Sequence, residues 1–95
     1  MKITKTVNGS NAVIAVDGWL DTQTSPQLGA AAQELSPDIE SVELDFSKLE
    51  YISSAGLRQI VAIYKSVNSL TITNVSAEIM DVFRMTGFDK RLDIR

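Results

Sequence analysis

An α/β fold with a mixed, mostly parallel sheet flanked by helices is predicted by three observations. Strand-type and helix-type patterns alternate along the chain in the order β-β-α-β-α-β-α-β. Strands joined through helices pair in parallel by right-handed crossovers. An Asn-Gly dipeptide joins the first two strands and makes that pair antiparallel. Because a chain of 95 residues holds one hydrophobic core, we expect a single domain over residues 1–95.

The first two strands form the predicted hairpin. Residues 3–7 are rich in β-branched side chains. Residues 12–16 form an unbroken apolar run, which is typical of a strand that is covered on both faces. Asp17-Gly18 ends this strand, and residues 19–25 are predicted to form a loop.

The first helix is predicted to begin at Ser25-Pro26, with the serine as N-cap and the proline at the first helical position. Gly29 weakens this helix by about 0.5–1 kcal/mol relative to alanine. Apolar residues with helical spacing define the inward face: Leu28, Ala31, Ala32 and Leu35.

The middle of the chain predicts a strand, a turn and a second helix. Residues 41–46 alternate between apolar and polar side chains, which indicates a strand with one buried face. We expect a turn after Phe46, beyond which Leu49 and Ile52 continue the apolar contact. The second helix begins near Ser54, and its inward face repeats the helical spacing: Leu57, Ile60, Val61 and Tyr64.

The last part of the chain predicts a short strand, a third helix and a final strand. Residues 69–73 are β-rich, and residues 91–94 resemble a last strand. Ser76 is a suitable N-cap for the helix between them, and Gly87 suits the left-handed position just beyond its end.

The composition excludes several classes of function. Cysteine and histidine are absent, which removes disulfides, thiol catalysis, zinc–thiolate sites and the usual general base. A net charge of −3 without a basic run is unsuited to nucleic-acid binding. No apolar run is long enough to span a bilayer, and no signal segment opens the chain. We therefore expect a cytoplasmic protein without metal or cofactor.

Acidic side chains raise the alternative of a hydrolytic carboxylate pair or a divalent-ion site. Asp17, Asp21 and Asp45 lie near predicted strand ends, where they could converge. On a small soluble domain, however, acids mostly solvate the surface. We predict no catalytic residue and no enzyme.

The strand-to-helix junction at residues 51–57 is the most unusual segment. Its small residues leave backbone N–H groups accessible at a helix N-terminus, where negative charge is favoured. A phosphate on a hydroxyl at this point would add about −1.5 to −2 charges to the surface. Alternatively, Ser53 and Ser54 only cap the helix. Gly56 then serves the close packing of helix on sheet, or a permissive backbone in the first turn.

The same segment, LDFSKLEYISSAGLRQI at residues 44–60, resembles the signature of STAS domains, the fold of bacterial anti-sigma factor antagonists. That signature is a strand, a turn and the pattern D-S-[ST]-G-L at the start of a helix. VDGWLD at residues 16–21 resembles the family's second strand with its G-x-L-D ending. Residues 73–94 resemble its third helix and final strand, so the resemblance covers nearly the whole chain.

The resemblance implies a protein that binds rather than catalyses. It implies a partner, an anti-sigma factor that is often a Ser/Thr protein kinase, whose capture by the unphosphorylated antagonist frees a sigma factor. In the family, phosphorylation of the residue before the motif's glycine reverses the capture. Here that acceptor position is Ala55, and Ser53 replaces the opening acid. Either Ser54 or Ser53 takes the phosphate, or the protein is not regulated in this way.

The resemblance also implies a docking surface. Asp21 matches the aspartate of the G-x-L-D pattern, with a turn former as its other interpretation. Trp19 is either an exposed anchor or a cap on the end of the core. The surface joins the loop after the second strand, the 53–57 loop and the outward face of the next helix: Trp19, Asp21, Thr22, Ser53, Ser54, Ala55, Gly56, Leu57, Arg58, Ala62 and Lys65.

Two other functions stay open from the sequence. A STAS module can act without a switch, as a subunit of a lipid-transport complex or of a sensory complex, because a fold does not fix a function. The stand-alone length favours the antagonist. A small hydrolase would need a concave site with a perturbed acid. We expect a monomer or a weak dimer.

Overall fold

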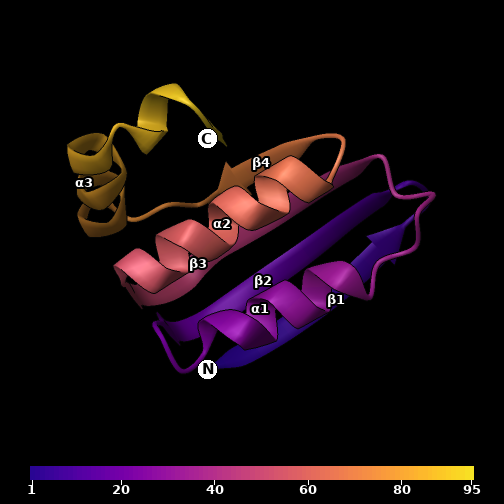
Figure 1. The fold of residues 1–95 in the computed structure, drawn as a ribbon, viewed down its shortest axis with the longest axis horizontal. Coiled ribbons are helices and arrows are strands. Elements are labelled where there is room, and N and C mark those ends of the chain that lie inside the picture. The colour runs from indigo at the N-terminus through magenta and orange to yellow at the C-terminus, as the bar shows by residue number, and fades with distance from the viewer.

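The computed structural model describes residues 1–95. The predicted order of strands and helices is confirmed (Figure 1). The elements are β1 (Lys2–Asn8), β2 (Asn11–Leu20), α1 (Ser25–Gln33), β3 (Ser41–Ile52), α2 (Ser54–Ser66), β4 (Leu70–Thr73), α3 (Ala77–Thr86), the short 3₁₀ helix η1 (Phe88–Lys90) and β5 (Asp93–Ile94).

The five strands form one sheet in the order β1-β2-β3-β4-β5. β1 and β2 pair antiparallel through the predicted hairpin, in whose turn Gly9 has a φ of 63°. A left-handed backbone of this kind is the conformation that glycine adopts most readily. The other neighbouring strands all pair in parallel, as predicted.

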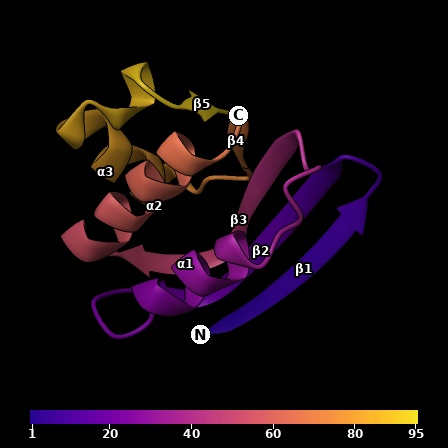
Figure 2. The same cartoon turned by 45° about the vertical axis from the view of Figure 1, so that its right-hand side comes forward.

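All three helices cover the same face of the sheet. Strands β2 to β5 follow one another across the sheet without reversal, and right-handed crossovers that always advance in one direction place every helix on one side. Figures 1 and 2 show this arrangement. A single core of 17 buried hydrophobic residues lies between the helices and the sheet. The prediction that residues 12–16 are covered on both faces is wrong, since Val13 and Ala15 are only half-buried.

Strand β3 runs without interruption to Ile52, so the predicted turn after Phe46 is wrong. The buried positions Phe46, Leu49 and Ile52 are three residues apart instead of two. The register with β2 shifts twice along this stretch. Each shift inserts one extra residue into β3, which is a β-bulge. The bulges let the strand bend while the same face stays buried.

Helix α1 begins one residue earlier than predicted. Thr24, and not Ser25, occupies the N-cap position, and its side chain makes no capping bond. The Thr24 hydroxyl is used elsewhere, since it donates to the carbonyl oxygen of Trp19 at 2.7 Å. Ser25 is buried, and its hydroxyl donates to the carbonyl oxygen of Asp21 at 2.5 Å.

Helix α3 has the ends that the sequence predicts. The Ser76 hydroxyl oxygen accepts the backbone N–H of Ile79 at 3.2 Å. Gly87 follows the helix with a φ of 78°, in the left-handed region. Both ends are therefore specified by local sequence alone.

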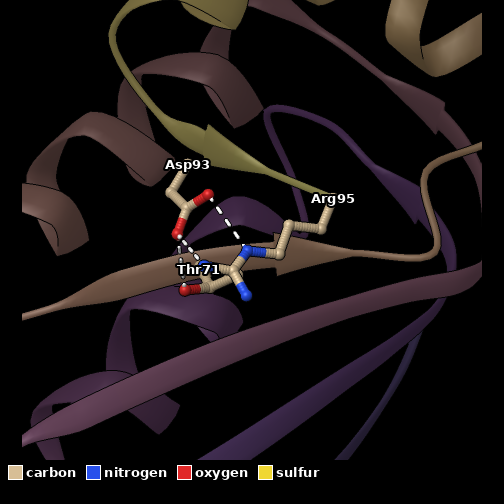
Figure 3. Close-up of polar contacts among 3 residues, drawn as sticks. All are labelled: Thr71, Asp93 and Arg95. Atoms are coloured by element: carbon tan, nitrogen blue, oxygen red, sulfur yellow. Dashed lines mark hydrogen bonds and ion pairs between the residues drawn. The ribbon is translucent and has the colours of Figure 1, made fainter.

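The C-terminal strand β5 is shorter than the predicted strand over residues 91–94. Its end is held by polar contacts to β4 (Figure 3). The Asp93 carboxylate accepts the hydroxyl of Thr71 at 3.3 Å and the guanidinium of Arg95 at 3.2 Å. The backbone N–H of Arg95 also donates to the carbonyl oxygen of Ile72 at 2.7 Å. These contacts fasten the last residues to the sheet.

Candidate functional site

The start of α2 is joined directly to the end of β2. The backbone N–H of Ser53 donates to the carbonyl oxygen of Leu20 at 2.9 Å. Ser53 is also the N-cap of α2, because its hydroxyl oxygen accepts the backbone N–H of Gly56 at 3.3 Å. The loop after β2 and the first turn of α2 therefore form one surface at the carboxyl ends of two neighbouring parallel strands (Figure 1).

Gly56 is required here by close packing. A Cβ atom at this position would lie 2.8 Å from Cγ1 of Ile52 and 2.9 Å from the carbonyl oxygen of Leu20. Real Cβ atoms do not approach other atoms so closely, and a backbone oxygen cannot rotate away. Of the two predicted roles for this glycine, the packing of helix on sheet is confirmed.

The two candidate phosphate acceptors differ in their surroundings. The Ser53 hydroxyl is half-buried and occupied by the capping bond. Ser54 is exposed, and its side chain makes no hydrogen bond within the protein. It lies at the first position of α2, where the N–H groups of a helix lack intrahelical acceptors. The Ser54 hydroxyl is therefore accessible from solvent, and no hydrogen bond of the fold depends on it.

Asp21 organises the loop after β2. Its carboxylate accepts the backbone N–H groups of Gln23 at 3.0 Å and of Thr24 at 3.1 Å. The bond from the Thr24 N–H is the largest cause that lowers the pKa of Asp21, and the Thr24 hydroxyl and the Gln23 N–H act in the same direction. The predicted role as a turn former is confirmed, and the carboxylate is charged at neutral pH.

The lowered pKa of Asp21 makes the loop sensitive to acid. A carboxyl whose pKa is depressed in the folded state stabilises the fold above its unfolded-state pKa of about 3.9, and this contribution is lost as the pH falls through the folded-state pKa. We expect the free energy of unfolding of Asp21→Asn to fall less steeply with decreasing pH below about pH 4 than that of the wild-type chain. Urea unfolding at several pH values in that range measures this slope. An unchanged slope would contradict the role given to the carboxylate.

Two exposed aromatic side chains stand beside this loop. Trp19 is 55% exposed and Tyr51 is 44% exposed. They are partners in the register of β2 with β3, and their ring centroids lie 5.0 Å apart with an interplanar angle of 40°. Leu20 is fully buried, so it is this leucine, and not the tryptophan, that fills the end of the core.

Sequence reasoning missed Tyr51 as a site residue. The signal was present in the spacing of three between Leu49 and Ile52, which leaves two consecutive residues facing away from the core. A strand with a strict period of two would expose only one of them.

The predicted docking residues are brought together in part. Trp19 lies at the end of β2, and Asp21 and Thr22 follow the strand. The hydrogen bond from Ser53 to Leu20 connects this segment to the start of α2. Arg58 is exposed on α2. Gly56 and Leu57 are buried, with Leu57 only 7% exposed, so these two shape the surface from beneath and offer no side chain to a partner.

Of the three acids that the hydrolase and divalent-ion alternatives bring together, Asp17 and Asp45 line one groove, which Lys2 and Lys48 also line, whereas Asp21 does not line it. No group of three or more acidic side chains in the structure is arranged to hold a metal ion. The Asp45 carboxylate accepts the side-chain amide of Asn74 and the backbone N–H of Ser47, each at 3.0 Å. The Asn74 bond is the largest cause that lowers the pKa of Asp45. A carboxyl that is held ionised in this way cannot donate a proton at neutral pH.

The family model described as "Mlab, STAS domain" matches residues 3–94. The chain is a STAS domain. None of its helices is long and apolar enough to cross a membrane.

Similar proteins are named as anti-sigma factor antagonists. "Putative anti-sigma factor antagonist BtrV" of Bordetella bronchiseptica is 28% identical over 93 residues, which are 93% of this chain and 80% of that protein. An anti-sigma factor antagonist from Mycobacterium paratuberculosis has a crystal structure with a TM-score of 0.88 at 22% identity, covering 98% of this STAS domain and 83% of that chain. The structure of the Bacillus cell fate determinant SpoIIAA in its phosphorylated form has a TM-score of 0.74 at 17% identity, and the match covers 99% of this STAS domain and 91% of that chain. These two structures show that the fold is shared.

Proposed function

We propose that this STAS domain is an anti-sigma factor antagonist, which binds an anti-sigma factor with Ser/Thr kinase activity and thereby frees a sigma factor in the cytoplasm. The proposal is supported by the names of the similar proteins. One observation of the structure carries it: the Ser53–Leu20 hydrogen bond joins the exposed start of α2 to the end of β2, and the exposed Trp19–Tyr51 pair lies on the last residues of β2 and β3 next to that junction.

The chemistry of this surface suits protein binding. Exposed aromatic residues at the centre of an interface contribute a large share of the binding energy. The polar loop of Asp21 follows β2, and Arg58 is an exposed cation on α2.

Capture from the native cytoplasm tests this proposal. The tagged chain is used as bait, and the proteins that co-purify are identified by mass spectrometry. We expect an anti-sigma factor with a kinase domain. A membrane-transport complex or a sensory complex in its place would overturn the antagonist proposal and favour a STAS module without this switch.

We further propose that Ser54 is the phosphate acceptor, since Ala55 occupies the usual position and the Ser53 hydroxyl caps α2. A phosphate on Ser54 would lie at the N-terminus of α2, where the helix dipole and the unbonded N–H groups favour negative charge. It would add about −1.5 to −2 charges to the docking surface and oppose capture of the partner.

Intact mass of the chain from its native cells measures this modification. We expect the mass of one phosphate on a fraction of the wild-type chain and none on Ser54→Ala. Ser53→Ala is the matched control: it loses a capping bond, which costs about 1 kcal/mol of stability, and keeps the phosphate. Phosphate that disappears with Ser53→Ala but persists in Ser54→Ala would reverse the assignment. A captured kinase without any phosphate would show binding without a switch.

A further inference from the structure

A groove between α2 and the segment after α3 is lined by residues that have no part in the argument for the proposed function. It encloses about 370 Å³, a volume in the lower range of ligand sites. The groove lies between the C-terminal half of α2 and the segment formed by η1 and the two residues after it. We call it the α2–η1 groove, and it is lined by Val61, Tyr64, Lys65, Phe88, Arg91 and Leu92.

The floor of the α2–η1 groove is apolar. Leu92 is buried, and Val61 and Phe88 are half-buried, so all three present carbon surface to the groove. Tyr64 also lines the groove and is 46% exposed. An apolar side chain from outside would cover this surface and remove it from water, which is favourable in proportion to the area covered.

Two cations without partners stand at the rim. Lys65 and Arg91 are both exposed, and neither takes part in any of the three ion pairs or in a side-chain hydrogen bond of the protein. No acidic residue lines the groove, and α2 contains none. The position of Lys65 in the last turn of α2 is favourable for the helix dipole. That explanation does not extend to Arg91, which lies beyond η1 on a different segment.

The local charge runs against that of the whole chain. The protein carries a net charge of −3, yet this groove presents two positive charges across an apolar floor. A surface that only completes the fold would not need two unpaired cations. A surface stabilised by internal ion pairs would place acidic residues of the chain next to Lys65 and Arg91. The arrangement is complementary to a ligand that carries an apolar group and negative charge together.

We propose that the α2–η1 groove docks a segment of a partner protein that presents an apolar side chain flanked by carboxylates. The apolar side chain would lie over Val61, Phe88 and Leu92, and the carboxylates would pair with Lys65 and Arg91. A segment of a protein fits better than a free fatty acid, because two exposed cations on separate segments can pair with two carboxylates, whereas a fatty acid carries one. This proposal does not depend on the identity of the partner that the α2 N-terminus binds.

A synthetic peptide tests the groove without any anti-sigma factor. The probe is a short capped peptide that alternates glutamate with leucine, titrated into the isotope-labelled chain and followed by backbone amide resonances. We expect the largest shifts at Val61, Tyr64 and Leu92. Replacing the peptide's glutamates by lysine, or its leucines by alanine, should abolish them.

Variants of the chain provide the matched controls. The double variant Lys65→Glu with Arg91→Glu should weaken binding of the peptide roughly tenfold or more, because two attractions become repulsions. Lys90→Glu makes the same charge change as the single variant Arg91→Glu, in the neighbouring residue, but Lys90 does not line the groove. We expect it to change the affinity less than twofold.

Three results would overturn the proposal. Equal losses of affinity in Lys90→Glu and in the single variant Arg91→Glu would reduce the effect to net charge. Resonance shifts centred on Ser54 or Trp19 would assign the peptide to the other surface. Binding of the chain to vesicles of anionic phospholipid, lost in the double variant while the peptide gives no shifts, would assign the two cations to a lipid surface.

Discussion

Replacement of Gly56 by alanine is expected to lower the free energy of unfolding by about 1–3 kcal/mol, as in other overpacked sites. The added methyl group would lie 2.9 Å from the carbonyl oxygen of Leu20, which is itself bonded to the N–H of Ser53. To make room, α2 must move away from the sheet or that hydrogen bond must lengthen. Urea unfolding followed by circular dichroism measures the loss.

Gly29→Ala is the matched control, because Gly29 also lies in a helix and also has a close neighbour. There the nearest atoms belong to the end of the Gln59 side chain, at 2.6–2.9 Å, and this flexible amide can rotate away. Alanine in a helix interior is more favourable than glycine by about 0.5–1 kcal/mol. We expect Gly29→Ala to be neutral or stabilising. If both variants lost equal stability, the packing argument for Gly56 would fail.

Replacement of Trp19 by alanine is expected to weaken capture of the anti-sigma partner by about 2 kcal/mol, roughly a thirtyfold rise in Kd. The expectation rests on the proposed function and on the exposure of this side chain beside Tyr51. The fold should be nearly unaffected, within about 0.5 kcal/mol, because the side chain lies outside the core. Calorimetric titration with the partner that capture identifies measures the affinity.

Val7→Ala tests whether this effect belongs to the site. Val7 is also 55% exposed, but it pairs with Ala12 at the opposite end of β2 from Trp19. Its loss should leave the affinity for the partner unchanged. Equal losses from the two variants, or a Trp19→Ala variant that binds at full strength, would show that the aromatic pair is not the anchor.

Local signals predicted most of the fold. Ser76 and Gly87 specify the ends of α3 through a side-chain bond and a left-handed backbone, both of which are properties of the nearest few residues. The Asn8-Gly9 hairpin is of the same kind. The alternation of strands with helices predicted the parallel pairing.

The errors lie where the outcome depends on contacts across the fold. The spacing of Phe46, Leu49 and Ile52 suggests a turn when β3 is considered alone, whereas pairing with β2 makes it a bulged strand. The apolar run over residues 12–16 gave no sign that one face lacks helices, because that depends on the order of the strands in the sheet.

The signature predicted the local structure at the candidate site: Ser53 and Gly56 lie at the start of α2, and Asp21 lies in the loop after β2. Ser53 caps α2 and Ser54 does not, and this difference depends on one hydrogen bond, which the sequence does not reveal. Tyr51 becomes part of the surface only through its register with Trp19.

The tight contact at Gly56 limits how a phosphate at Ser54 could act. With the carbonyl oxygen of Leu20 and the side chain of Ile52 directly against Gly56, α2 has no free space in which to shift toward the sheet. The two forms of the protein would then share one backbone and differ in surface potential alone. A partner would distinguish them by charge rather than by shape, so salt that screens charge would blunt the discrimination.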